Sequence, residues 1–273
     1  MDQVLYRIKD LTCSYDGSTP VLKIDELELM KGKQTVFVGK SGAGKSTILE
    51  TLGLMNRTIQ EGDITFYPEG GEGISLRSLW ENEDELAEIR NRYYSFIFQN
   101  TNLMNNFSAF ENACIPQLLQ GESMEEANRK VMEAMKKVGL SAIHGEDKVT
   151  QLSGGQRQRL AFVRAITPDF EVLFGDEPTG NLDELNAREL MAYIESDVHQ
   201  KKRSSILVSH HIDLSLLFAD QIILLVKHDE DSYGSVTGEN IFVTDRTNGS
   251  SAWLDMNGKR IKDIRTLLLD KLR

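Results

Sequence analysis

Residues 39–47, with the sequence GKSGAGKST, combine residue types and spacing that suit the binding of phosphate. Glycines let the backbone wrap closely around phosphate oxygens, so that successive N–H groups and the start of a following helix point at the anion. Within such a loop Lys45 would reach the terminal phosphates, and Ser46 would be a ligand of Mg²⁺. The sequence therefore predicts that ATP is bound by Gly39, Lys40, Ser41, Gly42, Ala43, Gly44, Lys45, Ser46 and Thr47.

Two adjacent carboxylates, Asp176 and Glu177, follow the apolar residues 172–174. Alone this pattern is weak, because acidic residues commonly end strands as solvated caps. Together with a phosphate loop, however, Asp176 would hold Mg²⁺ through its water shell, and Glu177 would orient and deprotonate an attacking water. The combination predicts hydrolysis of ATP with Glu177 as the base.

A third candidate, residues 152–156 with the sequence LSGGQ, precedes a segment in which apolar residues have helical spacing. Ser153 is a favourable helix N-cap, and the first N–H groups of that helix, beside Gly154 and Gly155, could form a second anion site. The alternative is a capped helix that binds nothing. The residues alone leave both interpretations open.

This run resembles the signature motif of ABC ATPases, and further positions match that family in order along the chain. The resemblance implies that Tyr15 stacks on adenine, although it could also be an ordinary strand tyrosine. It implies that Gln99 contacts Mg²⁺ and the attacking water and senses a transporter, and that His210 touches the γ-phosphate. Asp183, in residues 181–183, would belong to a loop that crosses to a second protomer.

The resemblance also implies a dimer of two ATPase subunits arranged head to tail. The phosphate loop of one subunit and the signature run of the other would then close on the same ATP, so Ser153, Gly154, Gly155 and Gln156 would contact the partner's nucleotide. The expected catalytic residues are Glu177, His210 and Gln99. The residues expected to hold Mg²⁺ are Ser46, Gln99 and Asp176.

A narrower similarity concerns residues 176–183, DEPTGNLD, together with residues 98–100 and 111–112. These are similar to the ATPases of the lipoprotein-release, macrolide-exporter and FtsE-type group, although His211 and Lys40 depart from the usual pattern. The similarity implies an ATP-hydrolysing subunit that powers an integral membrane permease or mechanotransmission subunit through dimer closure. It would lie on the cytoplasmic face of the inner membrane and touch the membrane only through that partner.

The alternative is a soluble ABC ATPase that does not transport, such as an iron–sulfur assembly scaffold component. A long coiled coil of the repair type is disfavoured, because the stretch between Lys45 and Ser153 is short and lacks sustained heptads. Recovery of an integral membrane partner in a pull-down would favour transport or mechanotransmission.

The segments around these motifs predict an α/β fold, specifically a P-loop NTPase core with a mostly parallel sheet. A short apolar run precedes the phosphate loop and helical spacing follows it, while the buried strands 171–174 and 205–208 are separated by an amphipathic helix at 184–200. Alternation in residues 4–8, 11–15 and 21–29 predicts antiparallel hairpins and hence an N-terminal β-subdomain.

An α-helical subdomain is expected at about residues 100–165, inserted in the core. We expect residues 1–232 to form the ATPase domain and residues 233–273 to form a β/α extension packed on or near it. The extension should contain a strand near residues 241–243 and a helix near residues 261–272.

Composition narrows the class of protein. The chain has 273 residues, 40% of them hydrophobic and 27% charged, which is ordinary for a folded protein of one large domain. A net charge of −11 argues against a nucleic-acid-binding face, which needs clustered Lys and Arg. Cys13 and Cys114 suit a reducing compartment. We expect no signal peptide, and the apolar run at residues 222–226 is far short of the roughly 20 residues that span a bilayer.

Overall fold

The computed structural model describes residues 3–143, 146–180, 182–227, 233–245 and 252–272. Its strands are β1 (Val4–Cys13), β2 (Leu22–Met30), β3 (Gln34–Gly39), β4 (Ile59–Phe66), β5 (Ile74–Ser75), β6 (Tyr94–Ile97), β7 (Val172–Asp176), β8 (Ser204–Val208), β9 (Gln221–Leu225), β10 (Gly234–Val236), β11 (Ile241–Asp245), β12 (Ala252–Asp255) and β13 (Arg260–Ile261). Its α-helices are α1 (Lys45–Leu52), α2 (Leu76–Leu79), α3 (Glu83–Tyr93), α4 (Ala109–Leu119), α5 (Met124–Lys137), α6 (Gly154–Ile166), α7 (Glu184–Lys201), α8 (Ile212–Phe218) and α9 (Ile264–Lys271).

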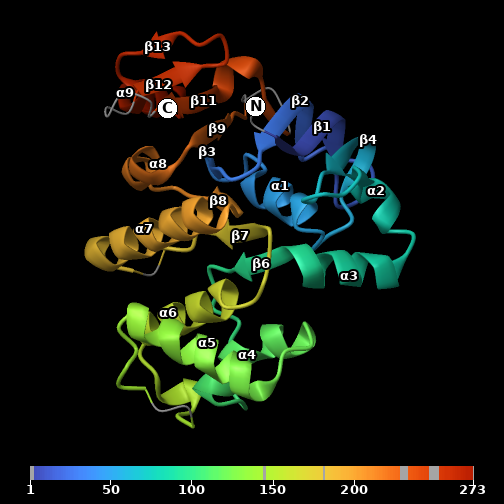
Figure 1. Cartoon of the computed structure of the whole chain (residues 1–273). Helices are drawn as coiled ribbons and strands as arrows, with labels where there is room; N and C mark the ends of the chain where they lie inside the picture. Colours follow the sequence, from blue (N-terminus) through green and yellow to red (C-terminus); the bar gives the residue numbers. More distant parts are fainter. Residues whose placement is uncertain (1–2, 144–145, 181, 228–232, 246–251, 273) are drawn as a thin grey trace.

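The described strands form a central sheet in the order β13-β12-β11-β9-β3-β8-β7-β6, in which β9, β3, β8, β7 and β6 are parallel. All residues of β3, β8 and β9 are buried, as parallel strands covered on both faces require. Helix α1 packs against β3, β7 and β8 on one side, and α7 and α8 lie on the other (Figure 1). The predicted α/β core with a mostly parallel sheet is confirmed.

A second sheet, in the order β10-β2-β1-β4-β5, forms the expected antiparallel β-subdomain. The alternating segments 4–8 and 11–15 lie mostly in one strand, because β1 continues from Val4 to Cys13. Asp10, with φ of 49°, bends this strand, and the pairing with β4 shifts register between Lys9 and Thr12. A bulge of this kind interrupts the apolar alternation, so that one strand looks like two segments in the sequence.

Aromatic side chains join the two sheets. Phe66 of β4 stacks on Tyr6 of β1 at a ring-centroid distance of 5.0 Å and meets the edge of Tyr94 of β6 at 5.4 Å. Tyr94 in turn contacts Phe174 of β7 at 5.0 Å. These rings are buried in the core between the sheets, which fixes the antiparallel sheet against the strand that carries Asp176.

Helices α4, α5 and α6 form the helical subdomain, which lies beyond β6 at the lower end of the molecule in Figure 1. Each begins at a serine N-cap, Ser108, Ser123 or Ser153, whose side chain accepts a hydrogen bond from a backbone N–H three residues later. Their apolar faces pack together and against β6, since α4 contacts both α5 and α6. The subdomain therefore meets the core at the strand that precedes Gln99.

The C-terminal part of the chain contributes to both sheets. Strand β10 lies parallel to β2, whereas β11, β12 and β13 extend the central sheet beyond β9 at the end opposite the helical subdomain (Figure 1). Arg265 of α9 bonds Asp213 of α8 at 2.6 Å. The division of the chain between residues 232 and 233 stays a prediction.

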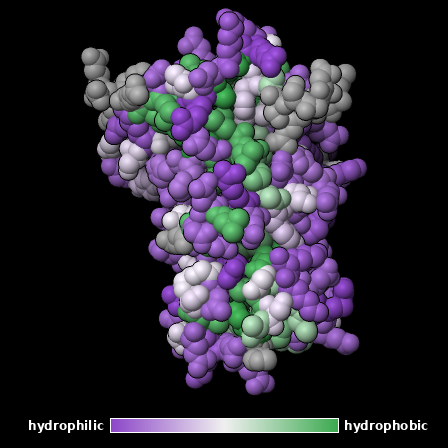
Figure 2. Space-filling model, turned by 90° about the vertical axis from the view of Figure 1, so that its left-hand side faces the viewer, coloured by the Kyte–Doolittle hydropathy of each residue, from purple (hydrophilic) through white to green (hydrophobic). Residues whose placement is uncertain are grey.

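The side of the molecule that carries α7 and α8 is mostly hydrophilic. Figure 2 shows a narrow apolar band on this face, running from the C-terminal strands down toward the helical subdomain. Among the described helices, none combines the length and apolarity that crossing a membrane requires.

Candidate functional site

The phosphate loop follows β3, the central buried strand, and leads into α1. Gly42 and Gly44 have φ values of 76° and 87°, which L-residues with a side chain rarely adopt. Gly44 is the N-cap of α1 and no side chain caps that helix, so the first N–H groups of α1 can serve a bound anion. The loop has the geometry expected of a phosphate cradle.

Lys45, the first residue of α1, turns its side chain back across this loop. Its Nζ donates hydrogen bonds of 2.9 Å to the carbonyl oxygens of Gly39 and Lys40. Burial lowers the pKa of Lys45, and the charges of Glu177 and Asp176 oppose that decrease. The ammonium group therefore contacts the loop backbone and is near the carboxylates of Glu177, the expected base, and Asp176, an expected Mg²⁺ ligand.

The carboxylates lie at the same sheet edge as the phosphate loop, because β3, β7 and β8 are parallel neighbours. Asp176 is the last residue of β7 and pairs with Val208, the last residue of β8. Burial, followed by the charges of Glu177 and Glu50, raises the pKa of Asp176, while Lys45 and His210 oppose the increase. A cation near Asp176 would relieve this repulsion.

Glu177 and His210 are in direct contact. The Nε2 atom of His210 lies 2.8 Å from Oε1 of Glu177, although the two residues are far apart in sequence. Glu177 has φ of 45°, and this conformation is held by its N–H, which donates to Val208 O, and by its carbonyl, which accepts from Gly180 N–H. The structure thus brings together the predicted base and the predicted γ-phosphate contact.

Tyr15 lies over α1 and leaves 55% of its surface exposed. Its hydroxyl donates to Oε2 of Glu50 at 2.7 Å and lies 3.2 Å from Oγ1 of Thr47. Burial of the hydroxyl end raises the pKa of Tyr15 to about 12. The sequence reasoning did not single out Glu50; its place one helical turn after Ser46 is a signal that could have found it.

Ser46 and Gln99 are both exposed at the edge where the parallel strands end. Ser46 is the second residue of α1, and Gln99 follows β6, whose Ile97 pairs with Gly175 of β7. Gln99 and Asp176 therefore leave neighbouring strands at the same edge. This placement agrees with a shared metal site, whose ligands remain a proposal.

The signature run starts α6 with a complete capping box. Ser153 Oγ accepts from Gln156 N–H at 3.2 Å, and Gln156 Oε1 accepts from Ser153 N–H at 2.8 Å. Gly154 and Gly155 have no heavy atom within 4 Å of a Cβ built on them, so their surface is open. Helix α6 packs on α4, α5 and β6, whereas α1 packs on β3, β7 and β8. Within one chain, the signature run and the phosphate loop therefore lie in different parts of the fold.

Asp183 is the N-cap of α7. Its carboxylate accepts bonds from the backbone N–H and the side-chain amide of Asn186, at 3.0 and 2.5 Å. These bonds lower the pKa of Asp183. Asn181, in the predicted crossing loop, lies outside the described residues.

Comparison with known families decides the class of the protein. The family model described as "ABC transporter" matches residues 22–180, which is more than half of the chain. The chain belongs to this family. As an ABC protein with both motif carboxylates, it is an ATPase whose fold is that of the P-loop NTPases.

Named relatives of this ABC ATPase fall into two groups. It is 37% identical to the lipoprotein-releasing system ATP-binding protein LolD of Chromohalobacter salexigens, over 77% of this chain and 86% of the relative. It is 35% identical to the macrolide export ATP-binding/permease protein MacB of Vibrio parahaemolyticus, over 82% of this chain. The chain spans about a third of the length of that macrolide export protein.

Solved structures of ABC cassettes have the same fold. A dimeric structure of the bacterial cassette MJ0796 is 30% identical with a TM-score of 0.71, over 81% of this chain and 94% of that one. A dimeric post-hydrolysis state of MJ0796, bound to ADP and phosphate, is 29% identical with a TM-score of 0.73, over 85% and 96%. The MJ0796 cassette therefore forms a dimer, and one of its dimeric states follows hydrolysis.

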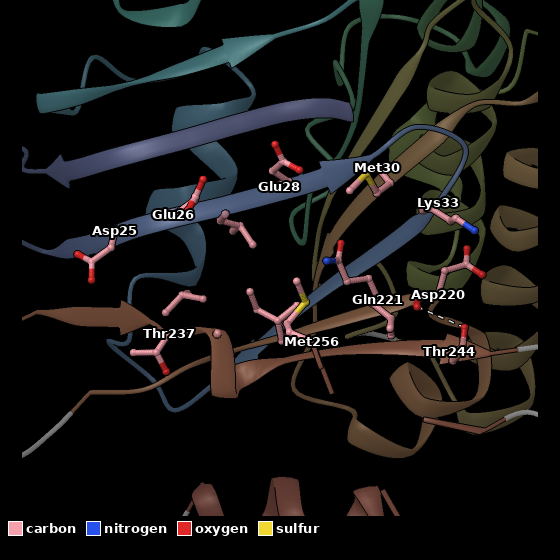
Figure 3. A pocket seen from close by; sticks show the side chains of 15 residues that line it. Asp25, Glu26, Glu28, Met30, Lys33, Asp220, Gln221, Thr237, Thr244 and Met256 are labelled. Atoms are coloured by element: carbon pink, nitrogen blue, oxygen red, sulfur yellow. Dashed lines mark hydrogen bonds between the residues drawn. The ribbon is translucent and has the colours of Figure 1, made fainter. Parts of the chain in front are cut away.

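A cavity of about 650 Å³ lies at the other end of the sheets in this ABC ATPase (Figure 3). Gln221, at the start of β9, lines it and pairs with Thr35 near the start of β3, whereas the phosphate loop begins where β3 ends. None of the expected site residues is among its described lining residues. Its apolar walls include Leu27, Met30, Val236, Ile241, Val243 and Met256.

Proposed function

We propose that this ABC ATPase works as a homodimer in which each ATP lies between the phosphate loop of one subunit and the signature run of the other. The observation that carries the proposal is the split arrangement within one chain. Lys45, Asp176, Glu177 and His210 converge at one sheet edge, but the open, capped start of α6 belongs to a different subdomain. A second subunit would supply the missing half of the site.

The residues present suit MgATP. Gly39–Gly44 amides and Lys45 would hold the phosphates, Tyr15 would stack on adenine, and Ser46, Gln99 and Asp176 would hold the metal. Mg²⁺ usually takes one or two protein oxygens together with substrate phosphates, and the carboxylate repulsion around Asp176 favours a cation there. When bound, the metal would neutralise charge on the β- and γ-phosphates.

Hydrolysis would then use groups already in contact. A carboxylate oxygen of Glu177 accepts a proton from water as the water oxygen bonds to the γ-phosphorus and the bond to the β-phosphate oxygen breaks, giving ADP and phosphate. His210, bonded to Oε1 of Glu177, orients the carboxylate and reaches the γ-phosphate. Lys45 and the loop N–H groups stabilise the charge on the phosphate oxygens.

The substitution Glu177→Gln tests this assignment. It keeps the shape of the side chain but removes the base, so we expect ATP binding to persist, the dimer to stay closed, and turnover to fall by at least about 100-fold. Phosphate release and size-exclusion chromatography with ATP measure these effects. Glu184→Gln, a surface change on α7, is the control; turnover of Glu177→Gln at the wild-type rate would contradict the role.

We further propose that the dimer lies on the cytoplasmic face of the inner membrane and drives an integral membrane partner, as the names of the lipoprotein-releasing and macrolide export relatives suggest. A groove of about 510 Å³ supports this proposal. It lies between α4 and the segment around Gln99, with Phe98 and Asn102 on one wall and Leu119, which is 70% exposed, on the other. An apolar segment of the partner that docked there would contact the loop that carries Gln99.

A pull-down from membranes tests the partner. Wild-type protein should co-purify with an integral membrane protein, and Leu119→Glu should reduce that recovery because it puts a charge in the groove. Met132→Glu changes another exposed apolar residue, on α5 and outside the groove, and should not reduce the recovery. Recovery of soluble proteins alone, or equal loss with both variants, would count against the groove as the docking site.

A further inference from the structure

Gln158, in the second turn of α6, bonds directly to the segment that follows the catalytic base. Its Nε2 donates a 2.8 Å hydrogen bond to the carbonyl oxygen of Pro178, and only 3% of the residue is exposed. Within the described structure, the Oε1 atom of Gln158 has no hydrogen-bond partner. The amide is therefore oriented by the bond that it donates to Pro178.

This bond holds the peptide group between Pro178 and Thr179, one residue beyond Glu177. Pro178 is buried between two anchors, since its carbonyl accepts from Gln158 and its ring lies against Gly175, where an added Cβ would come within 3.4 Å of it. Glu177 itself has φ of 45°, a conformation that its surroundings must maintain. Loss of the Gln158 bond would free the chain on one side of the base.

The next residue of α6 makes a second, longer connection to the same segment. Arg159 Nη1 lies 3.4 Å from Oδ1 of Asn186, which in turn bonds Asp183 at the start of α7. Two consecutive residues of α6 thus contact Pro178, just after the base, and Asn186, in the first turn of α7. A rotation or translation of α6 would be transmitted to the backbone beside Glu177.

We propose that Gln158 is a positioning residue that couples the Ser153 end of α6 to Glu177 of the same chain. The inference rests on the proposed function, in which Ser153–Gly155 of a subunit contact the partner's ATP while Glu177 of that subunit acts on its own. Closure of α6 on one ATP then sets the orientation of the base at the other. Gln158 makes hydrolysis at one site depend on occupancy of the second.

Mixed dimers separate this role from a merely structural one. In a dimer of one Glu177→Gln subunit and one subunit with an intact base, only one site can turn over. That site uses the intact base and the signature run of the Glu177→Gln subunit. Gln158→Met, which keeps the length but removes the donor, is placed in either subunit, and single-turnover phosphate release is measured.

The expected result is asymmetric. Gln158→Met in the subunit with the intact Glu177 should slow release about tenfold without changing ATP affinity. The same change in the Glu177→Gln subunit should alter the rate by less than twofold, although that subunit provides the signature run. The reverse asymmetry, or equal slowing in both, would overturn the proposal, because Gln158 would then act by shaping the start of α6.

A second variant uses the chemistry of the donor. Gln158→Glu can donate to Pro178 O only when its carboxyl is protonated, so its rate relative to wild type should rise as the pH is lowered. Gln158→Met should show a constant ratio over the same range. A constant ratio for Gln158→Glu as well would contradict the requirement for a donor at this position.

Two controls complete the design. Gln117→Met removes another fully buried glutamine of the same subdomain, on α4, and should leave the single-turnover rate unchanged at matched thermal stability. The reference dimer with both Gln158 residues intact must turn over at its one site. If it does not, the shared-site arrangement itself fails, and the inference is overturned together with the proposed function.

Discussion

Glu177 combines an unusual backbone conformation with a direct contact to His210. A non-glycine residue with φ of 45° costs about 1–3 kcal/mol, and the bonds to Val208 and Gly180 offset that cost. The conformation belongs to the turn that places the side chain 2.8 Å from the imidazole. The strain therefore serves the orientation of the base.

The first prediction concerns this pair. His210→Ala removes the group that orients Glu177, and we expect kcat to fall about 100-fold while ATP binding changes little. Steady-state kinetics and a separate binding measurement check both parts. His211→Ala alters an exposed neighbouring histidine at the start of α8 and should stay within twofold of wild type; a similar loss in both variants would assign the effect to the loop instead.

A second prediction concerns the buried phenols. Burial, then the neighbouring phenol of Tyr94, raises the pKa of Tyr6 well above its ordinary value near 10. The folded state keeps this proton when the unfolded state loses it, so the stabilisation is fully present below pH 10 and is lost as pH rises further. The slope is about 1.4 kcal/mol per pH unit for one phenol.

Tyr6→Phe should therefore reduce the loss of unfolding free energy between pH 10 and 11.5, as measured by denaturant titration at each pH. Tyr67→Phe removes the hydroxyl of a half-buried tyrosine just after β4 and is the control for the loss of a phenol elsewhere. Parallel slopes for Tyr6→Phe and wild type would show that the phenol does not ionise on unfolding.

The residues that motifs could predict are those whose chemical type the reaction requires. Lys45, Asp176, Glu177 and His210 follow from a phosphate loop and strand ends, and the structure brings them together. The motifs did not assign the contacts of Glu50 with Tyr15 and of Gln158 with Pro178, because these contacts come from tertiary packing of distant segments. Both residues lie within a few positions of a motif, but neither motif specifies these contacts.

At the scale of elements, the parallel core was predictable because buried strands and amphipathic helices alternate along residues 171–225. The kink at Asp10 was not, since one residue with positive φ breaks the alternation without ending the strand. The position of β10 was also hidden. Three residues, Gly234–Val236, have too little pattern to indicate that they pair with β2, near the start of the chain.

A third prediction follows from that strand. A Cβ on Gly234 would overlap the carbonyl oxygen of Ala43 in the phosphate loop. Gly234→Ala should therefore push β10 and the loop apart, lowering the unfolding free energy by about 1–3 kcal/mol and weakening ATP binding. Thermal unfolding and nucleotide titration measure the two effects.

Gly238→Ala provides the matched control. It lies just after β10, and an added Cβ would meet no heavy atom within 4 Å. We expect its stability to stay within about 0.5 kcal/mol of wild type and its ATP affinity to be unchanged. If Gly234→Ala behaved in the same way, the contact between β10 and the phosphate loop would have no influence on nucleotide binding.

At the scale of the whole molecule, the helical subdomain and the C-terminal strands lie at opposite ends of the central sheet (Figure 1). The phosphate loop lies between them, where β3 leads into α1. The open start of α6 belongs to the subdomain beyond β6. This arrangement suits an ATPase in which closure of the two subunits moves the helical subdomain, and with it the groove beside Gln99. The resemblance to ABC ATPases implied the dimer, but only the fold separates the two half-sites in space.

The last prediction tests that separation. A Lys45→Ala subunit has a defective phosphate loop and an intact signature run, and a Ser153→Arg subunit has the reverse defects. Each homodimer should be nearly inactive. A mixed dimer should have one working site, formed by the phosphate loop of the Ser153→Arg subunit and the signature run of the Lys45→Ala subunit.

Random mixing makes half of the dimers mixed, each with one intact site of two, so recovered activity should reach at most roughly a quarter of wild type. Phosphate release after subunit exchange measures the recovery. Recovery of half or more would mean that the two defects do not fall in the same site. No recovery would mean that each site is built within one chain, or that a working site also needs ATP at the second site, as proposed for Gln158.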